Sequence, residues 1–69
     1  MRDFLDRMAE CLEMESVTAD FRLRDAPGWS SLMGFSILVA IENDYGRQIA
    51  PDDFAKMETV GDVARAIGA

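Results

Sequence analysis

Apolar residues return at helical spacing in three stretches of the chain, and the first of these lies at the N-terminus. Its apolar positions are Phe4, Met8, Cys11 and Leu12, with Leu5 widening the stripe. Charged residues occupy the opposite face, and Asp3 is placed to cap the first turn. The pattern predicts an amphipathic helix over residues 3–14.

The second stretch, residues 31–45, predicts a longer helix with an unusually broad apolar arc. Its core stripe is spaced three, three, three and four residues apart, at Leu32, Phe35, Leu38, Ile41 and Tyr45. Met33, Ile37 and Val39 lie off that stripe. Either this helix is more deeply buried than its neighbours, or it offers an apolar contact surface. A serine can cap its start, and Gly46 suits the left-handed conformation that ends a helix.

Between these two helices the periodicity fails. Residues 15–30 are rich in residues typical of turns and loops, namely Thr18, Asp20, Asp25, Pro27 and Gly28. Phe21 and Leu23 alternate with two arginines. We therefore expect this long loop to be ordered, with its apolar side chains held against the helices.

The C-terminal third predicts one short helix and one longer helix. Pro51 and the two aspartates after it suit a helix N-terminus, which gives a short helix over residues 51–56. Thr59, followed three places later by Asp62, resembles a capping box that opens the last helix. The buried face and terminating glycine of that helix are Val60, Val63, Ile67 and Gly68. Residues 1–69 are therefore predicted to form one all-α domain, a bundle of three longer helices and one short helix.

Charge and hydropathy narrow the functional classes. Thirteen acidic residues against seven basic ones give a formal charge of −6. Nucleic acid binding is disfavoured, because it relies on basic residues that neutralise phosphates. A basic protein partner is more natural, although the charge can equally serve solubility alone. The longest apolar run, residues 37–41, is too short for a membrane span, and the N-terminus lacks the apolar core of a signal peptide. These features predict a soluble cytoplasmic protein.

Two residue counts exclude most catalytic chemistry. The chain has no histidine and a single cysteine, Cys11. An imidazole base or metal ligand is therefore excluded, as are an internal disulfide and a cysteine-rich zinc site. Cys11 falls among apolar positions, which favours a buried small hydrophobe over a reactive thiol. We expect no catalytic residues and no metal site.

Two segments connect these elements to a known family. Gly28-Trp29-Ser30-Ser31-Leu32 opens the second predicted helix, and Thr59-Val60-Gly61-Asp62-Val63 opens the last. With the acidic-aromatic-glycine end at Ile41–Gly46, they give the chain a resemblance to acyl carrier proteins over essentially its whole length. In that family a serine within Asp-Ser-Leu at this helix start bears 4′-phosphopantetheine. The resemblance implies that Ser31 is the attachment site and that coenzyme A and a separate phosphopantetheinyl transferase supply the arm. It also implies that the protein itself is non-catalytic.

One position departs from the family motif. Ser30 stands where the family usually has aspartate, which helps the transferase and its metal engage the carrier. A hydroxyl is a poorer magnesium ligand than a carboxylate. Modification could therefore be slower, need a dedicated transferase, or be absent. Ser30 is also a weaker alternative attachment site, because it lies one residue out of the Ser-Leu register.

The resemblance also implies a partner surface and an acyl pocket. The second helix carries no charge before Glu42, so its partner surface is expected to be apolar and to comprise Leu32, Met33, Ile37 and Val39. These residues could equally pack against the long loop. Candidates for the acyl pocket are Phe35, Leu38, Ile41, Ile49, Phe54, Met57 and Val63. Every one of them would also serve as ordinary core.

The leading hypothesis is a free-standing, monomeric carrier of acyl thioesters. Separate loading and processing enzymes of fatty acid, polyketide or related specialised biosynthesis would use it, and Met1 just before the first helix favours such a discrete protein. An aminoacyl or peptidyl carrier is the alternative within this class. An unmodified, carrier-like interaction module is the alternative outside it. A hydrolase with Ser31 as nucleophile would lack a base.

Overall fold

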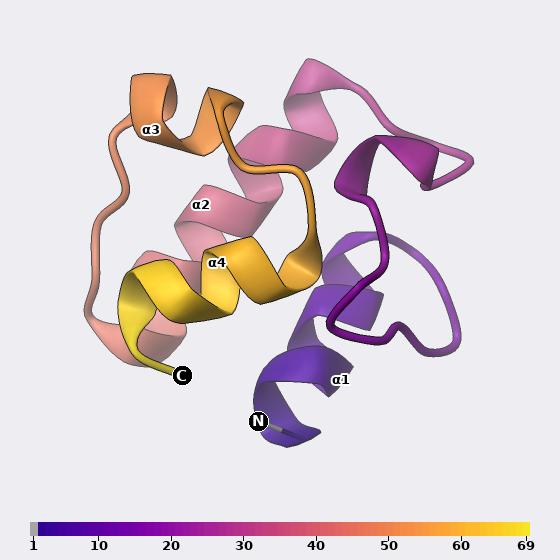
Figure 1. Cartoon of the computed structure of the whole chain (residues 1–69), viewed down its shortest axis with the longest axis horizontal. Coiled ribbons are helices and arrows are strands. Elements are labelled where there is room, and N and C mark those ends of the chain that lie inside the picture. The colour runs from indigo at the N-terminus through magenta and orange to yellow at the C-terminus, as the bar shows by residue number, and fades with distance from the viewer. Residues whose placement is uncertain (1) are drawn as a thin grey trace.

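The structure is a computed structural model that describes residues 2–69, apart from the side chain of Arg2. Within this part of the chain, four α-helices follow one another: α1 (Arg2–Cys11), α2 (Ser31–Tyr45), α3 (Pro51–Ala55) and α4 (Val60–Ile67). A single turn of 3₁₀ helix, η1 (Leu23–Asp25), lies between α1 and α2. Figure 1 shows α2 passing behind α4, with α3 at one end of the molecule and α1 at the other. The predicted bundle of three longer helices and one short helix is confirmed.

The core lies where α1, α2 and α4 face one another. Its largest side chains come from these helices and the α1–α2 loop: Phe4, Met8, Leu12, Leu23, Met33, Ile37, Ile41, Val60, Val63 and Ile67. The predicted buried face of the last helix is confirmed, as is the burial of Phe4, Met8 and Leu12 in the first stretch, whereas Leu5 and Cys11 are half-buried. Removal of these side chains from water is the main favourable contribution to folding.

The face that α2 buries differs from the predicted one. Its buried residues are Met33, Gly34, Ile37, Ala40 and Ile41. Of the predicted core stripe, Leu32, Phe35 and Tyr45 are exposed, Leu38 is half-buried, and Ile41 alone is fully buried. The prediction was wrong because α2 is apolar around most of its circumference. The small residues Gly34 and Ala40 let neighbouring elements approach closely, which selects their side as the core face.

α1 ends at Cys11, before the predicted end at residue 14. Glu13 adopts a left-handed conformation with φ 58°, and the Met14 amide donates to the Ala9 carbonyl at 2.9 Å. This turn closes the helix without a glycine. Asp3 lies inside the first turn and not at the cap, so its carboxylate still faces the positive end of the helix dipole.

The loop between α1 and α2 is ordered by contacts with the α3–α4 connection and the first turn of α4. Leu23 is buried in the core, as the alternating pattern predicted. A Cβ atom on Gly61 would lie 3.0 Å from the Ala19 carbonyl oxygen, so a glycine is needed for the two segments to meet. Three backbone hydrogen bonds join them: Leu23 N to Glu58 O at 2.9 Å, Val60 N to Phe21 O at 3.0 Å, and Gly61 N to Ala19 O at 2.7 Å.

The predicted helix signals in the C-terminal half are confirmed. Pro51 is the first residue of α3, which ends at Ala55. Thr59 and Asp62 form the predicted capping box, in which each side chain accepts from the other's backbone amide. Gly46 and Gly68 end α2 and α4 in left-handed conformations. None of the helices within residues 2–69 combines the length and apolarity that crossing a bilayer requires.

Candidate functional site

Two adjacent serines open α2, and the backbone assigns them different positions. Ser30 is extended, with φ −160° and ψ 171°, and is the N-cap residue. Its hydroxyl oxygen accepts a hydrogen bond from the Met33 amide at 3.3 Å. The serine that caps α2 is therefore Ser30.

Ser31 is the first residue of α2 and is exposed. Within residues 2–69, its hydroxyl makes no hydrogen bond, and the backbone amides of Ser31 and Leu32 have no acceptor. Unpaired amides at the start of a fifteen-residue helix carry a partial positive charge. The Ser31 hydroxyl thus lies in water beside two free donors and the positive end of a helix dipole.

A groove of about 420 Å³ begins at Ser31. On one side Trp29 stacks on Phe54, with ring centroids 6.5 Å apart and 30° between the planes. Gly34 forms part of its floor, where a Cβ atom would lie only 3.3 Å from the Phe54 ring. The complete lining is Arg24, Trp29, Ser31, Gly34, Phe35, Leu38, Pro51, Phe54 and Ala55.

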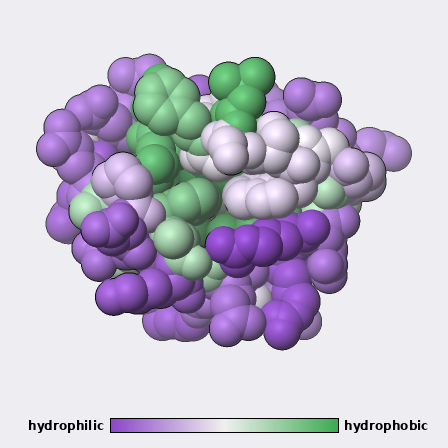
Figure 2. All heavy atoms as spheres, turned by 90° about the horizontal axis from the view of Figure 1, so that it is seen from above, coloured by the Kyte–Doolittle hydropathy of each residue, from purple (hydrophilic) through white to green (hydrophobic). Residues whose placement is uncertain are grey.

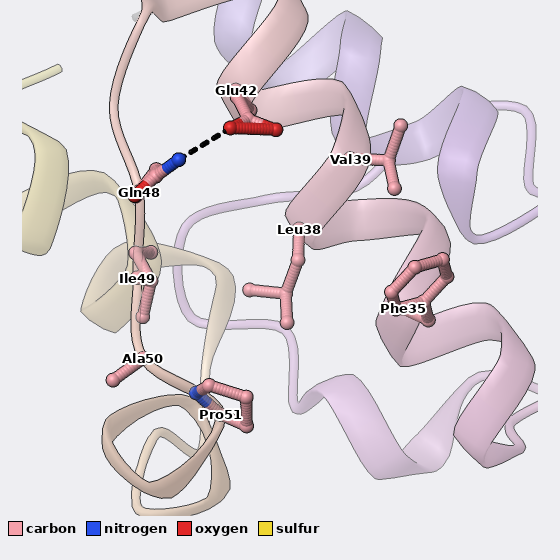
Figure 3. A pocket seen from close by; sticks show the side chains of 8 residues that line it. All are labelled: Phe35, Leu38, Val39, Glu42, Gln48, Ile49, Ala50 and Pro51. Carbon is pink, nitrogen blue, oxygen red and sulfur yellow. Dashed lines mark hydrogen bonds between the residues drawn. The ribbon is translucent and has the colours of Figure 1, made fainter.

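A second groove, of about 510 Å³, continues the first along α2. The two share Phe35, Leu38 and Pro51 in their linings. Figure 3 shows Leu38 facing the segment that runs from Gln48 to Pro51, with Phe35 and Val39 further around α2. At the far end the Gln48 amide donates to the Glu42 carboxylate at 2.6 Å. The path from Ser31 is therefore mainly apolar and ends at a polar pair.

Comparison of the sequence with protein families gives a match to the phosphopantetheine attachment site family over residues 3–67. The chain belongs to this family. Neither the curated proteins nor the solved structures gave a match. Domains of the phosphopantetheine family carry 4′-phosphopantetheine covalently, are non-catalytic, and are substrates of phosphopantetheinyl transferases. The site fits that cofactor, because a phosphodiester needs an exposed hydroxyl and is stabilised by free amides at a helix start.

The predicted acyl-pocket residues of this phosphopantetheine carrier divide into two groups. Phe35, Leu38, Ile49 and Phe54 line one or both grooves. Ile41 and Val63 are fully buried and Met57 packs against the core, and none of the three lines either groove. These three residues occupy core positions, the alternative that the sequence also allowed. Helical spacing could not separate the two roles, because both require an inward-facing apolar side chain.

The predicted partner surface of the carrier also divides. Met33 and Ile37 are buried, so their assignment to an exposed contact surface was wrong. Leu32 is 74% exposed and Val39 is also exposed. Phe35, which the sequence had placed in the core, is 62% exposed and lies between these two on the same side of α2. We call Leu32, Phe35 and Val39 the apolar face of α2.

The carrier's site contains one charged residue that the sequence did not reveal. Arg24 lines the groove beside Ser31, although it belongs to η1 in the preceding loop. Its alternation with Leu23 indicated that it points outward. Nothing in the sequence showed which part of the molecule it would reach, because a loop has no fixed spacing.

Cys11 lies away from Ser31, in a groove of about 350 Å³ between α1 and α2. It is half-buried, and not fully buried as predicted. Burial raises the pKa of its thiol, and the nearby positive charge of Arg7 offsets only part of that effect. A raised pKa keeps the thiol protonated, which agrees with the expectation of an unreactive side chain.

Proposed function

We propose that this protein is a carrier that holds 4′-phosphopantetheine on Ser31 and presents acyl groups to separate enzymes. The thiol at the end of the arm supplies the chemistry, since it holds acyl groups as thioesters. The chain's own residues would anchor the arm, orient it and offer a docking surface. Fatty acid and polyketide pathways both use carriers of this kind. Aminoacyl or peptidyl groups are the alternative class of cargo.

One observation carries the choice of Ser31 over Ser30. The Ser30 hydroxyl accepts the Met33 amide and lies in an extended residue before the helix. The Ser31 hydroxyl is exposed and free, beside the two unpaired amides of the first turn. A transferase needs a hydroxyl that can reach its own active site without breaking the carrier's helix cap. Only Ser31 meets that condition.

The apolar face of α2 supports docking of the transferase and of loading and processing enzymes. Leu32, Phe35 and Val39 follow helical spacing from the attachment end of α2. Figure 2 shows an apolar area on this end of the molecule, with hydrophilic residues on its left and lower sides. Exposed apolar side chains within a polar rim are typical of protein contact surfaces. The acidic residues elsewhere would favour a partner with a basic rim.

The grooves support a role in holding cargo. They run from Ser31 between α2 and the 48–55 segment, and their lining is largely apolar. An acyl chain attached to the arm could lie there and be shielded from water. The Glu42–Gln48 pair at the far end also offers an acceptor for an aminoacyl group, which keeps the alternative cargo class in view.

The test is modification of the purified protein with coenzyme A, magnesium and a broad-specificity phosphopantetheinyl transferase, followed by intact mass. Ser30→Ala and Ser31→Ala are treated in parallel. We expect the mass of one phosphopantetheine group to be added to the wild type and to Ser30→Ala, and not to Ser31→Ala. No gain in any protein, repeated with the host's own transferase, would favour an unmodified interaction module.

A further inference from the structure

The groove beside Ser31 has an unusual charge for this protein. The chain carries thirteen acidic and seven basic residues, so most of its surface is negative. Among the described residues, the only charged residue in the groove lining is a cation, Arg24, and none of them places a carboxylate there. The lining of the groove next to Ser31 therefore carries one positive charge and no negative charge.

Arg24 is fixed in position by its neighbours. The adjacent Leu23 is buried in the core and its amide donates to the Glu58 carbonyl. The Arg24 guanidinium donates through Nη2 to the Ala55 carbonyl at 3.2 Å and through Nη1 to the Met57 carbonyl at 3.4 Å. These bonds hold the side chain at the end of α3, across the groove from α2.

The charge of Arg24 is not neutralised by these contacts. Carbonyl oxygens are dipoles, and within residues 2–69 no carboxylate lies within 4 Å of this guanidinium. Three other arginines do have carboxylate partners: Arg7 with Glu10 and Asp44, Arg22 with Glu58, and Arg65 with Asp62. A guanidinium has five N–H donors, so donors remain available on Arg24 after two bonds.

We propose that Arg24 contacts the phosphodiester that joins the arm to Ser31. The proposal rests on attachment at Ser31, which the preceding subsection proposes. A phosphodiester is an anion at any physiological pH, and arginine is well suited to bind phosphate oxygens. The Ser31 and Leu32 amides would face the phosphate from the helix, and Arg24 from the opposite wall of the groove. The mixture of donors resembles other anion sites in proteins.

The contact gives Arg24 a positioning role. A phosphate held against Arg24 directs the arm into the groove between Trp29 and Leu38. Without this contact, the arm is free to extend over the apolar face of α2 or into solvent. Arg24 would therefore bias the carrier toward a state in which arm and cargo are shielded, and a partner enzyme would have to draw them out.

The experiment measures coupling between the arm and Arg24. Thermal unfolding is recorded for the unmodified and modified forms of the wild type, of Arg24→Gln, and of Arg22→Gln. Arg22 is a matched control, because it lies two residues away and pairs with Glu58 instead of facing the groove. We expect attachment of the arm to raise Tm by roughly 2 to 4 °C more in the wild type and Arg22→Gln than in Arg24→Gln.

A purely structural role for Arg24 predicts a different result. If Arg24 only tethers the loop to the end of α3, Arg24→Gln lowers Tm equally in both forms and the gain on modification is unchanged. That outcome overturns the proposal. Failure of every protein to accept the arm would instead contradict the proposed function, and the mass measurement separates the two.

A second measurement needs no variant. The side-chain Nε–H resonances of Arg22 and Arg24 are followed by NMR before and after modification of the wild-type protein. We expect a clear shift for Arg24, a much smaller one for Arg22, and a weaker Arg24 shift at high salt, because screening weakens exposed ion contacts. Equal small shifts for the two arginines would contradict the contact.

Discussion

At the scale of single residues, Ser30 and Ser31 have the same side chain in different backbone positions. Ser30 precedes the helix in an extended conformation, which directs its oxygen back to the Met33 amide. Ser31 is already the first residue of the helix, and its exposed hydroxyl makes no hydrogen bond to the Met33 amide. Replacement of Ser30 should therefore change the stability of the protein, whereas replacement of Ser31 should change its modification.

Replacement of Ser30 by alanine removes the cap and is expected to lower the free energy of unfolding by about 1 kcal/mol. Ser31→Ala should change it much less. Urea denaturation of the two variants measures the difference. Ser30→Asp is the matched control, because aspartate also accepts from the third amide and should retain the wild-type stability. Equal losses in Ser30→Ala and Ser31→Ala would contradict the assigned cap.

At the scale of elements, α2 presents two apolar surfaces and buries only one. Ile37 is 0% exposed and lies in the core, whereas Leu32 is on the apolar face. The first surface holds the bundle together, and the second is available to a partner. The two surfaces can be tested separately because one is buried in the core and the other is exposed.

Ile37→Val should lower the free energy of unfolding by about 1 kcal/mol, since it deletes a buried methyl group. Leu32→Ala should change it by less than about 0.5 kcal/mol, because the side chain is in water. The same Leu32→Ala protein should be modified several-fold more slowly by the transferase if the apolar face is its docking surface. Denaturation curves and modification rates report the two effects. Normal modification of Leu32→Ala would leave α2 without a role in docking.

The bounds of α2 and the caps of α4 were predictable because their signals are local. Thr59, Asp62, Gly46 and Gly68 act within one helical turn, so the sequence alone states their roles. The buried face of α2 was not predictable in this way. Both sides of the helix are apolar, and the choice depends on how closely Gly34 lets Phe54 approach. That contact is between elements far apart in the chain.

The residues that line the grooves were also only partly predictable from the sequence. Phe35, Leu38, Ile49 and Phe54 were chosen as pocket candidates because they are apolar at suitable positions, and the structure brings them to the grooves. The same criterion also selected Ile41 and Val63, which belong to the core. The position of Arg24 beside Ser31 was not predictable from the sequence, because it depends on the path of a loop.

The cap of α4 introduces a dependence on pH. Amides of Glu58 and Thr59 donate to the Asp62 carboxylate, and with Arg65 they hold the pKa of Asp62 below its ordinary value of 3.8. A lowered folded-state pKa stabilises the protein fully above the unfolded-state value. That stabilisation declines as pH falls between the two values, and it is gone below the folded-state pKa.

Asp62→Asn should therefore unfold with a weaker pH dependence than the wild type. Urea midpoints measured from neutral pH into the range below 3.8 give the comparison. Asp52→Asn is the control, because the Asp52 carboxylate accepts no capping bond within residues 2–69 and this variant should keep the wild-type slope. Parallel slopes for Asp62→Asn and the wild type would rule out this carboxylate as a source of acid sensitivity.

At the scale of the whole molecule, we infer that residues 1–69 fold as one cooperative domain. The core draws on α1, α2, α4 and the loop together, and no part of it is complete without the others. Trp29 provides a probe at the groove, because it stacks on Phe54, and circular dichroism reports the helices.

Unfolding should follow the same curve by Trp29 fluorescence and by circular dichroism, with a free energy of roughly 3 to 10 kcal/mol for a chain of this size. Chemical denaturation monitored by both signals is the measurement. A fluorescence change that precedes the loss of helix would indicate that the groove opens separately and that the domain has two cooperative parts.

The bonds between the α1–α2 loop and the α3–α4 connection bear on the order of events during synthesis. Arg22 and Glu58 lie 36 positions apart in the chain, and the backbone bonds around them also join residues far apart in the sequence. Contacts of such long range form late, because closing the intervening chain costs entropy before the contact stabilises it. On a ribosome the loop that leads to Ser31 would therefore lack its supports until α4 had emerged. The proposed attachment site would therefore mature last, although Ser31 lies in the first half of the chain.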